Sequence, residues 1–401
     1  MMDSTDILVV GGGVAGLAAA ARLASDGASV IVADAKPPQP TDWAAEGADL
    51  RTTAFLHPAI ETFRKAGAWD GMVPHAEALW VMRILDAGGR ENRVREQADF
   101  EAAEMGERPF GFNVANVAAR GALMERLEAL DVELRAPAGL EELTLRDDAA
   151  FARLANGSSV KAKLVVGADG RDSGVRAAAG IGVRRWSYGQ KAMVFAVSHT
   201  VPHGGVSTEI HRSGGPFTLV PMQDRDGTHR SAVVWMERGP EAERLAGLSK
   251  SDFELVLNER GLGVLGDLRL VGERQLWPIV GRLADRMAAT RTALMAEAVH
   301  VIPPIGAQGL NMSLADLEDL AERVAAARAA GEDIGSATLL KGYQRRRWPE
   351  TAARVAGVDA LNRAARADMQ AIRDLRRIGL TLVNRLPFTR RAAMTIGMGA
   401  G

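Results

Sequence analysis

The stretch TDILVVGGGVAGLAAAARLASDGASVIVADA, residues 5 to 35, decides the fold. It opens with the apolar run Ile7 to Val10, which predicts a strand. Gly11, Gly13 and Gly16 follow in G-x-G-x-x-G spacing and lead into an Ala-rich helical run. A second apolar run then ends in an aspartate. The order of strand, tight turn, helix, strand and acidic residue predicts a Rossmann-like unit.

Each residue of this turn has a physical reason to be there. Gly11 permits the tight turn, Gly13 lets the backbone approach a diphosphate, and Gly16 lets the helix pack on the strand. The helix N-terminus offers free N–H groups and a positive dipole end to the diphosphate. Asp34 can accept a hydrogen bond from a ribose hydroxyl. The unit therefore predicts a dinucleotide, but NAD and FAD present the same ADP half to it.

Composition narrows the function classes. The chain of 401 residues is 47% hydrophobic and 25% charged, which is typical of a globular protein with two or three domains. Its 49 basic and 50 acidic residues nearly cancel, so no global field attracts nucleic acid. Cysteine is absent, which excludes disulfides, iron–sulfur clusters and cysteine-ligated zinc. We predict a cytoplasmic protein that has no metal site and takes its redox chemistry from a bound cofactor.

The middle of the chain changes in character. The segment KLVVGADGRDSGVRAAAGI contains a strand-like run, Leu164 to Val166, followed by Asp169 and Gly170, and it predicts a return to the first sheet. Short β-rich runs fill the chain from about residue 181 to 278. We predict an α/β (α+β) fold with a Rossmann-like domain, an inserted β-sheet substrate domain and C-terminal helices. The predicted boundaries are 1–180 with short substrate-domain excursions, 181–280, 281–365 and a helical tail at 366–401.

Two further features leave alternatives open. Aromatic side chains of the β-rich part either wall an apolar pocket or form ordinary core: Trp186, Tyr188, His211, Phe217 and Trp235. The last segment, DLRRIGLTLVNRLPFTRRAAMTIGMGAG, is basic and amphipathic, with arginines at 376, 377, 385, 390 and 391. Such a tail either lies on an anionic membrane surface or packs as a helix on the protein.

Late in the chain, VHVIPPIGAQGLNMSLADLEDLA runs from a strand through a Pro/Gly loop into a helix. This segment, the first glycine motif and the Asp169-Gly170 segment occur in the order that resembles aromatic-ring flavoprotein monooxygenases with the para-hydroxybenzoate hydroxylase fold. The stretches YQRRRWPETAARVAGVDALNR and LVNRLPFTRRAAMTIGMG further resemble the ubiquinone-biosynthesis hydroxylase family. The resemblance covers almost the whole chain.

The resemblance implies FAD as cofactor, with NAD(P)H or another electron donor and O2 as co-substrates. The FAD-contacting positions that it implies are Gly11, Gly13, Val14, Ala15, Gly16, Asp34, Arg51, Arg120, Asp169, Glu297, Pro304, Gly306, Gly309, Leu310 and Asn311. His300 is the one acid/base candidate, although a structural or cofactor-shell role suits it better. Because the cofactor carries the chemistry, no dedicated catalytic residues are expected.

The implied reaction is hydroxylation of a polyprenylated phenol in ubiquinone biosynthesis through a flavin C(4a)-hydroperoxide. Implied partners are this phenol, a ubiquinone-biosynthetic complex and a membrane surface under the tail, but no nucleic acid. The chain has Ala296-Glu297 where the family usually has Gly-Asp, and Val299 where it has Ala. Three alternatives remain: a hydroxylase of a soluble aromatic, an accessory homologue with weak FAD binding, and a nicotinamide-dependent dehydrogenase that leaves the late loop unexplained.

Overall fold

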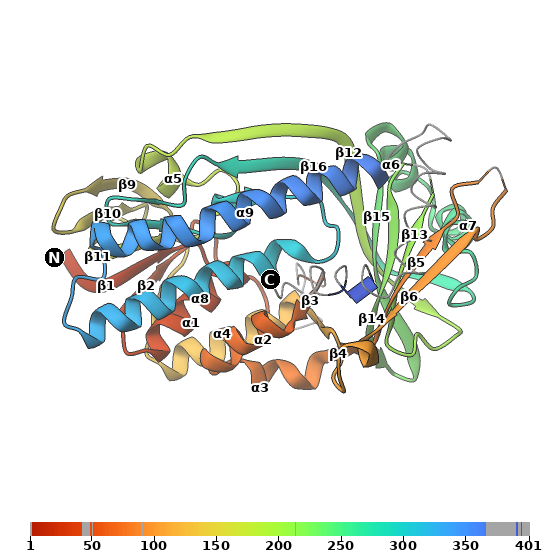
Figure 1. The fold of residues 1–401 in the computed structure, drawn as a ribbon, viewed down its shortest axis with the longest axis horizontal. Helices are drawn as coiled ribbons and strands as arrows, with labels where there is room; N and C mark the ends of the chain where they lie inside the picture. The colour runs from red at the N-terminus through yellow and green to blue at the C-terminus, as the bar shows by residue number, and fades with distance from the viewer. Residues whose placement is uncertain are drawn as a thin grey trace.

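The computed structural model describes residues 2–41, 49, 51–89, 91–212, 214–365, 390, 391 and 394. It contains two large sheets joined by long strands and by one long helix, α9 (Figure 1). A first sheet lies at the N-terminal side, a second sheet stands at the opposite end, and a small third sheet lies between them. This mixed architecture confirms the predicted fold class.

The first sheet has the order β17-β18-β11-β1-β2-β8, and β10 and β9 continue from β11. Its strands are β1 (Met2–Val10), β2 (Val30–Ala33), β8 (Glu133–Arg135), β9 (Leu140–Leu145), β10 (Ala150–Leu154), β11 (Ser159–Gly167), β17 (Ala288–Ala289) and β18 (Thr292–Leu294). β1 pairs in parallel with both β2 and β11. The central strands are buried apolar runs because parallel sheets are covered on both faces. The predicted return of the chain to this sheet at Leu164 to Val166 is confirmed.

Helices cover this sheet and build its core. They are α1 (Val14–Ser25), α2 (His57–Lys65), α3 (Trp69–Met72), α4 (Asn116–Ala129), α5 (Gly174–Ala178), α8 (Gln308–Ala329) and α9 (Ala337–Ala365), with short 3-10 turns η1 (Val73–His75) and η3 (Ala296–Ala298). α1 packs against both α4 and α8. Apolar residues at helical spacing predict helices at 117–130, 314–330 and 339–361, and these correspond to α4, α8 and α9. The same spacing predicts a helix at 367–383, which lies outside the described residues.

The second sheet has the order β19-β16-β12-β15-β14-β13-β5-β6. Its strands are β5 (Val81–Asp86), β6 (Glu96–Glu101), β12 (Val183–His199), β13 (Val206–His211), β14 (Pro216–Arg225), β15 (Thr228–Arg238), β16 (Leu268–Ala284) and β19 (His300–Val301). One face packs under α6 (Gly239–Ala246) and α7 (Lys250–Gly261). The other face contacts Ile305 of the loop before α8. We call this second face the inner face, and it is the part of the fold that bears on function.

The small third sheet has the order β3-β7-β4, with strands β3 (Thr52–Leu56), β4 (Ala76–Leu79) and β7 (Gly111–Ala115). It adjoins the second sheet through β14, where Asn113 Nδ2 donates to Pro221 O at 2.7 Å. The 3-10 turn η2 (Ala102–Glu104) follows β6. The domain boundaries given above stay a prediction.

Candidate cofactor site

The turn after β1 and the first turn of α1 each contain a glycine that the fold itself requires. Gly11 has φ +116°, and a Cβ built on it would lie 2.3 Å from Ala168 O. A Cβ on Gly16 would lie 1.8 Å from Gly11 O. No side chain fits at either position because the neighbouring atoms belong to the backbone. The close packing of turn, helix and strand that we predicted from these glycines is therefore present.

Gly13 differs, because no described atom of the protein lies close enough to require glycine at this position. It precedes α1 with φ −74° and ψ 172°, which any residue adopts. A Cβ built there would meet nothing within 4 Å. The first amides of α1, from Val14 on, have no carbonyl one turn earlier and remain donors. Open space in front of free N–H groups at a helix N-terminus is the arrangement that a diphosphate needs.

Asp34 stands beside this turn at the end of β2. Its carboxylate accepts from Gly12 N and, at 2.7 Å, from Lys36 N. Each carboxylate oxygen has further lone pairs, so Asp34 can still accept from a ribose hydroxyl. A cavity of about 120 Å³ opens here, lined by Gly12, Gly13, Asp34, Lys36, Pro37, Pro38, Gln39, Arg120, Met124, Leu134 and Ala136. Two of the predicted contacts, Asp34 and Arg120, therefore meet in one cavity with Gly13.

Two predicted residues hold buried polar atoms without a partner. Arg120 donates to Gly12 O at 2.8 Å and to Gln39 Oε1 at 2.9 Å, yet its Nε has no acceptor among the described residues. Burial lowers the pKa of Arg120, and Asp49 and Asp34 oppose that effect. Asp169 accepts from Val175 N through one oxygen, while its other oxygen is buried and unpaired within the same part of the chain. A dinucleotide could satisfy both, with phosphate oxygens as acceptors and sugar hydroxyls as donors.

Arg51 is held by a neighbouring acid. Its guanidinium donates twice to Asp49, at 2.7 and 2.6 Å, and lies 5.0 Å from the ring centroid of Trp277 on β16. The hydrogen bond with Asp49 raises the pKa of Arg51 against the effect of burial, and the charge of Glu297 raises it further. Sequence reasoning missed Asp49, which carries no motif. Arg51 thus links the cofactor side of the molecule to the second sheet.

The loop before α8 follows β19 and leads into the helix, which is the predicted order of strand, Pro/Gly loop and helix. Gly306 has φ +63°, and the next residue, Ala307, also lies in the left-handed region at φ +53°. Gly309 lies in the first turn of α8, where an added Cβ would meet nothing within 4 Å. Gly309 therefore resembles Gly13, because each lies at a helix N-terminus with open space beside its Cα atom. Pro304 and Leu310 belong to the same segment, and Leu310 packs against the core of the first sheet.

The side chain of Asn311 forms hydrogen bonds within the protein. Its Oδ1 accepts from Leu56 N at 2.9 Å, and its Nδ2 donates to Ala54 O at 2.8 Å. These bonds attach the start of α8 to β3. A third bond, from Nδ2 to Ala307 O at 2.7 Å, fixes the helix N-terminus itself. The amide side chain of Asn311 therefore positions the helix, a role that the sequence motif did not reveal.

Ala296 and Glu297 mark the departure from the family pattern. Ala296 has φ +56°, a conformation that favours glycine. The side chain of Glu297 is about half exposed and lies 3.3 Å from Arg171, which follows Gly170 in the mid-chain motif. Its carboxylate is thus directed toward an arginine of the protein. A cofactor contact by Glu297 stays a prediction, and its side chain has a partner, Arg171, that sequence spacing could not reveal.

His300 belongs to a buried polar cluster. It is 3% exposed, and its Nε2 lies 3.6 Å from Asp316 Oδ2 on α8. Asp316 accepts from Arg347 Nε on α9 at 2.8 Å. The cluster links β19, α8 and α9 in the interior. This position supports the structural role for His300 over an acid/base role.

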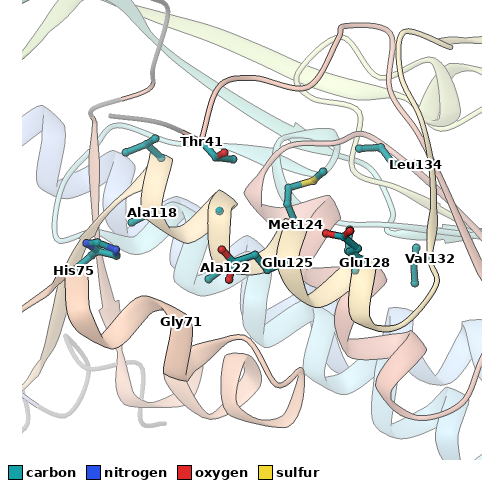
Figure 2. A pocket seen from close by; sticks show the side chains of 13 residues that line it. Thr41, Gly71, His75, Ala118, Ala122, Met124, Glu125, Glu128, Val132 and Leu134 are labelled. Carbon is teal, nitrogen blue, oxygen red and sulfur yellow. The ribbon is translucent and has the colours of Figure 1, made fainter. Parts of the chain in front are cut away.

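A larger cavity of about 600 Å³ lies along α4 (Figure 2). Its lining includes His75, Glu125 and Glu128, and it shares Met124 and Leu134 with the smaller cavity beside Asp34. None of the predicted site residues lines it. Three of the predicted contacts, Gly13, Asp34 and Arg120, line the smaller cavity instead.

The aromatic residues of the second sheet divide between its two faces. Phe217 and Trp235 pack edge to face at 5.4 Å in the core under α6 and α7. Trp186 and Tyr188 belong to the inner face, where Trp186 Nε1 donates to Tyr188 Oη at 2.7 Å. The five aromatics therefore do not wall one pocket, because alternate strand positions point to opposite faces.

The described part of the tail packs on the protein. Arg390 Nε donates to Glu104 at 2.6 Å, and its guanidinium lies 4.9 Å from the ring of Phe100. Met394 is buried beside Phe100 and Ala98. Arg376, Arg377 and Arg385 lie outside the described residues.

The described residues contain no group of three or more His, Asp or Glu side chains placed to bind a metal ion. None of the described helices combines the length and the hydropathy needed to cross a bilayer.

Solved structures share this fold. The p-nitrophenol 4-monooxygenase of Pseudomonas putida superposes with a TM-score of 0.80 at 20% identity, covering 100% of this chain and 99% of that chain. PqsL of Pseudomonas aeruginosa, in complex with 2-aminobenzoylacetate, gives a TM-score of 0.76 at 20% identity, covering 93% and 99%. These likenesses establish the architecture.

Sequence comparison establishes the family. The model of the family described as FAD binding domain matches residues 4–357. Ubiquinone hydroxylase UbiL of Rhodospirillum rubrum is 35% identical over 98% of this chain and 89% of its own length. The 3-demethoxyubiquinol 3-hydroxylase of Escherichia coli is 29% identical over 98% of both chains. The chain therefore belongs to the FAD binding domain family of flavoproteins, and ubiquinone hydroxylases are among its relatives.

Proposed function

We propose that this protein is an FAD-dependent monooxygenase that hydroxylates the aromatic ring of a polyprenylated phenol in ubiquinone biosynthesis. The structural observation that carries the proposal is the pair of open glycines, Gly13 and Gly309, at two helix N-termini. A nicotinamide-dependent dehydrogenase would use the open position at Gly13, but it would have no use for the open position at Gly309. The names of the relatives supply the substrate class.

The residues present fit FAD, and each has a defined task. The α1 N-terminus and Arg120 would hold the diphosphate, and Asp34 would hold the adenosine ribose. Asp169 and Glu297 would accept from the hydroxyls of the ribityl side. The N-terminus of α8 would favour negative charge on the isoalloxazine ring through its dipole. When bound, FAD supplies the transfer of electrons from a donor to O2 and of one oxygen atom to the substrate.

The protein also shapes the place where an apolar substrate reacts. The inner face of the second sheet presents Ala192, Val194, Val234 and Met236 toward Ile305 of the loop before α8. An apolar wall beside the cofactor loop excludes water and suits a prenylated ring. Dedicated catalytic residues are not needed for this reaction, because the cofactor carries the chemistry.

Three finer points stay predictions. They are membership of a ubiquinone-biosynthetic complex, peripheral contact of the C-terminal tail with a membrane surface, and cytoplasmic location. The relatives' names support action on an intermediate of ubiquinone biosynthesis. Cosedimentation of the full-length protein with anionic vesicles, with neutral vesicles as the control, tests the membrane contact directly.

The first experiment is an absorption spectrum of the purified protein, before and after incubation with FAD and gel filtration. Retained flavin bands are expected. Turnover is then measured with a short-chain prenylphenol, NAD(P)H and ¹⁸O2, and one labelled oxygen atom is expected in the product. A Gly13→Ala variant, which should fold but bind FAD weakly, is the matched control. A folded protein that stays colourless would contradict the proposal and favour the accessory role.

A further inference from the structure

A polar pair lies on the inner face of the second sheet. β13 carries Glu209 and His211, which alternate with the buried residues Thr208 and Ile210. Ile210 belongs to the core under α6 and α7. Because side chains alternate along a strand, Glu209 and His211 point to the opposite face. That face is the one that contacts the loop before α8.

The sheet register places this pair in line with the apolar wall of the inner face. Glu209 is directly opposite Thr218 on β14, and Thr218 is opposite Val234 on β15. Val234 packs in the cluster that contains Ile305. Residues directly opposite one another in a sheet project to the same side. The pair therefore shares its face with the apolar residues that meet the cofactor loop.

The two side chains are bound closely to one another. His211 Nε2 lies 2.6 Å from Glu209 Oε1, and the side chains are 12% and 21% exposed. His211 Nδ1 is buried and has no hydrogen-bond partner among the described residues. A buried polar atom without a partner is uncommon in native proteins and requires an explanation.

Neighbouring charged residues do not explain why Glu209 and His211 are placed together on this face. Asp86 on β5 is the residue opposite His211, but it accepts from Arg95 Nη2 at 2.6 Å and is 1% exposed. On β5 and β6 the row beside Glu209 continues with Ile84 and Ala98, which are apolar. No described residue bonds the second carboxylate oxygen of Glu209. The Glu209 carboxylate therefore lies beside apolar residues, and one of its oxygens is available to accept a hydrogen bond.

We propose that Glu209 receives the hydroxyl of the phenolic substrate, and that His211 positions Glu209 for this contact. The inference rests on the proposed function. A charged acceptor forms the stronger class of hydrogen bond, so it discriminates a ring that carries a free O–H from one that does not. It also draws negative charge onto the phenolic oxygen, which favours attack by the ring on an electrophilic oxygen. No proton is transferred in this step.

The test uses the FAD-bound full-length protein and two ligands, 2-geranylphenol and its methyl ether. The ether has nearly the same shape but cannot donate a hydrogen bond. Dissociation constants are read from the change in flavin absorption. We expect the protein to prefer the phenol by about 10- to 100-fold, the range of a hydrogen bond to a charged group. Glu209→Leu should abolish this preference, and Glu209→Gln and His211→Phe should reduce it.

The control is another His–acid pair of the same sheet. His229 Nδ1 lies 2.7 Å from Asp224 Oδ2, and both side chains are substantially exposed. His229→Phe should leave the preference unchanged. The ratio of two dissociation constants within one variant does not depend on the amount of folded protein. A flavin-bound Glu209→Leu protein with the original preference would overturn the inference.

The outcome also separates this inference from the proposed function. If the wild-type protein binds neither ligand, the proposed function fails, and this inference fails with it. If it binds both ligands equally and hydroxylates 2-geranylphenol, only the role of Glu209 fails.

Discussion

Gly309 allows the cofactor assignment to be tested by a change that should stabilise the protein. It lies in the first turn of α8 with helical neighbours, and a Cβ built on it meets nothing within 4 Å. The fold therefore has no need of glycine at this position. We predict that Gly309→Ala raises the free energy of unfolding of the FAD-free protein and weakens FAD binding.

The two effects have magnitudes that follow from the structure. Replacing helical glycine with alanine removes a cost of roughly 0.5–1 kcal/mol, because alanine has fewer unfolded conformations. A methyl group in the space that a ligand occupies costs about 1–3 kcal/mol, the range for overpacking a well-filled site. That range corresponds to a dissociation constant for FAD raised by about 5- to 150-fold.

Urea unfolding of the FAD-free protein measures the first effect, and quenching of flavin fluorescence on titration measures the second. Gly357 is the matched control, since it is an exposed glycine within α9 and an added Cβ there also meets nothing within 4 Å. Gly357→Ala should raise stability and leave FAD binding alone. A Gly309→Ala protein that binds FAD as tightly as the wild type would refute the assignment of α8 to the cofactor.

Three further predictions follow from single residues. Gly16→Ala should cost about 1–3 kcal/mol of stability and abolish FAD retention, since the new Cβ would lie 1.8 Å from Gly11 O; unchanged urea midpoints and a yellow protein would contradict this. Ala296→Gly should stabilise the FAD-free protein by roughly 0.5–1 kcal/mol. Alanine in the left-handed conformation costs about 1–2 kcal/mol, and the larger conformational entropy of glycine in the unfolded chain offsets about 0.4–1 kcal/mol of the gain. Combined with Glu297→Asp, the substitution should tighten FAD binding, and an unchanged or weaker dissociation constant argues against that account. Burial, the largest effect, and the hydrogen bond to Asp359 raise the pKa of Tyr188 to about 12, and burial raises that of Tyr343 well above its usual range. The raised pKa of Tyr188 contributes stability that is complete below pH 10 and is lost as the pH rises toward 12; native absorbance at 295 nm should therefore stay flat through pH 10, and a tyrosinate midpoint near 10 would exclude these environments.

The sequence predicted well those elements whose residue types are set by local backbone contacts or by apolar packing. Gly11 and Gly16 are constrained by backbone atoms, so their spacing alone determined the β1–α1 turn. The apolar run at Leu164 to Val166 predicted a return of the chain to the first sheet, where β11 pairs in parallel with β1. The same holds for α4, α8 and α9, whose apolar spacing is set by packing on a sheet or on one another.

Features that depend on distant partners could not be predicted. Arg171 and Glu297 are 126 residues apart, and no local pattern joins them. The side chain of Asn311 bonds to β3, although its motif indicated only a cofactor contact. β5 and β6 join the second sheet from a segment between β4 and α4 because β13 pairs in parallel with β5. His211 was recognised as an aromatic of the β-rich part, but its pairing with Glu209 required the strand register.

The glycines of this chain explain why the first motif could not distinguish NAD from FAD while the whole fold can. Gly11 and Gly16 are needed by any protein that builds this turn, with or without a ligand. No described part of the protein requires glycine at position 13, and a bound diphosphate would explain it, but both cofactors carry a diphosphate. Gly309 is also without a reason in the protein, and it lies some three hundred residues later at another helix N-terminus. Charges connect the two places, because Arg120 interacts with Asp34 and Asp49 while Arg51 interacts with Asp49 and Glu297. A single cofactor long enough to need both helix ends accounts for all of these residues, and FAD meets that requirement.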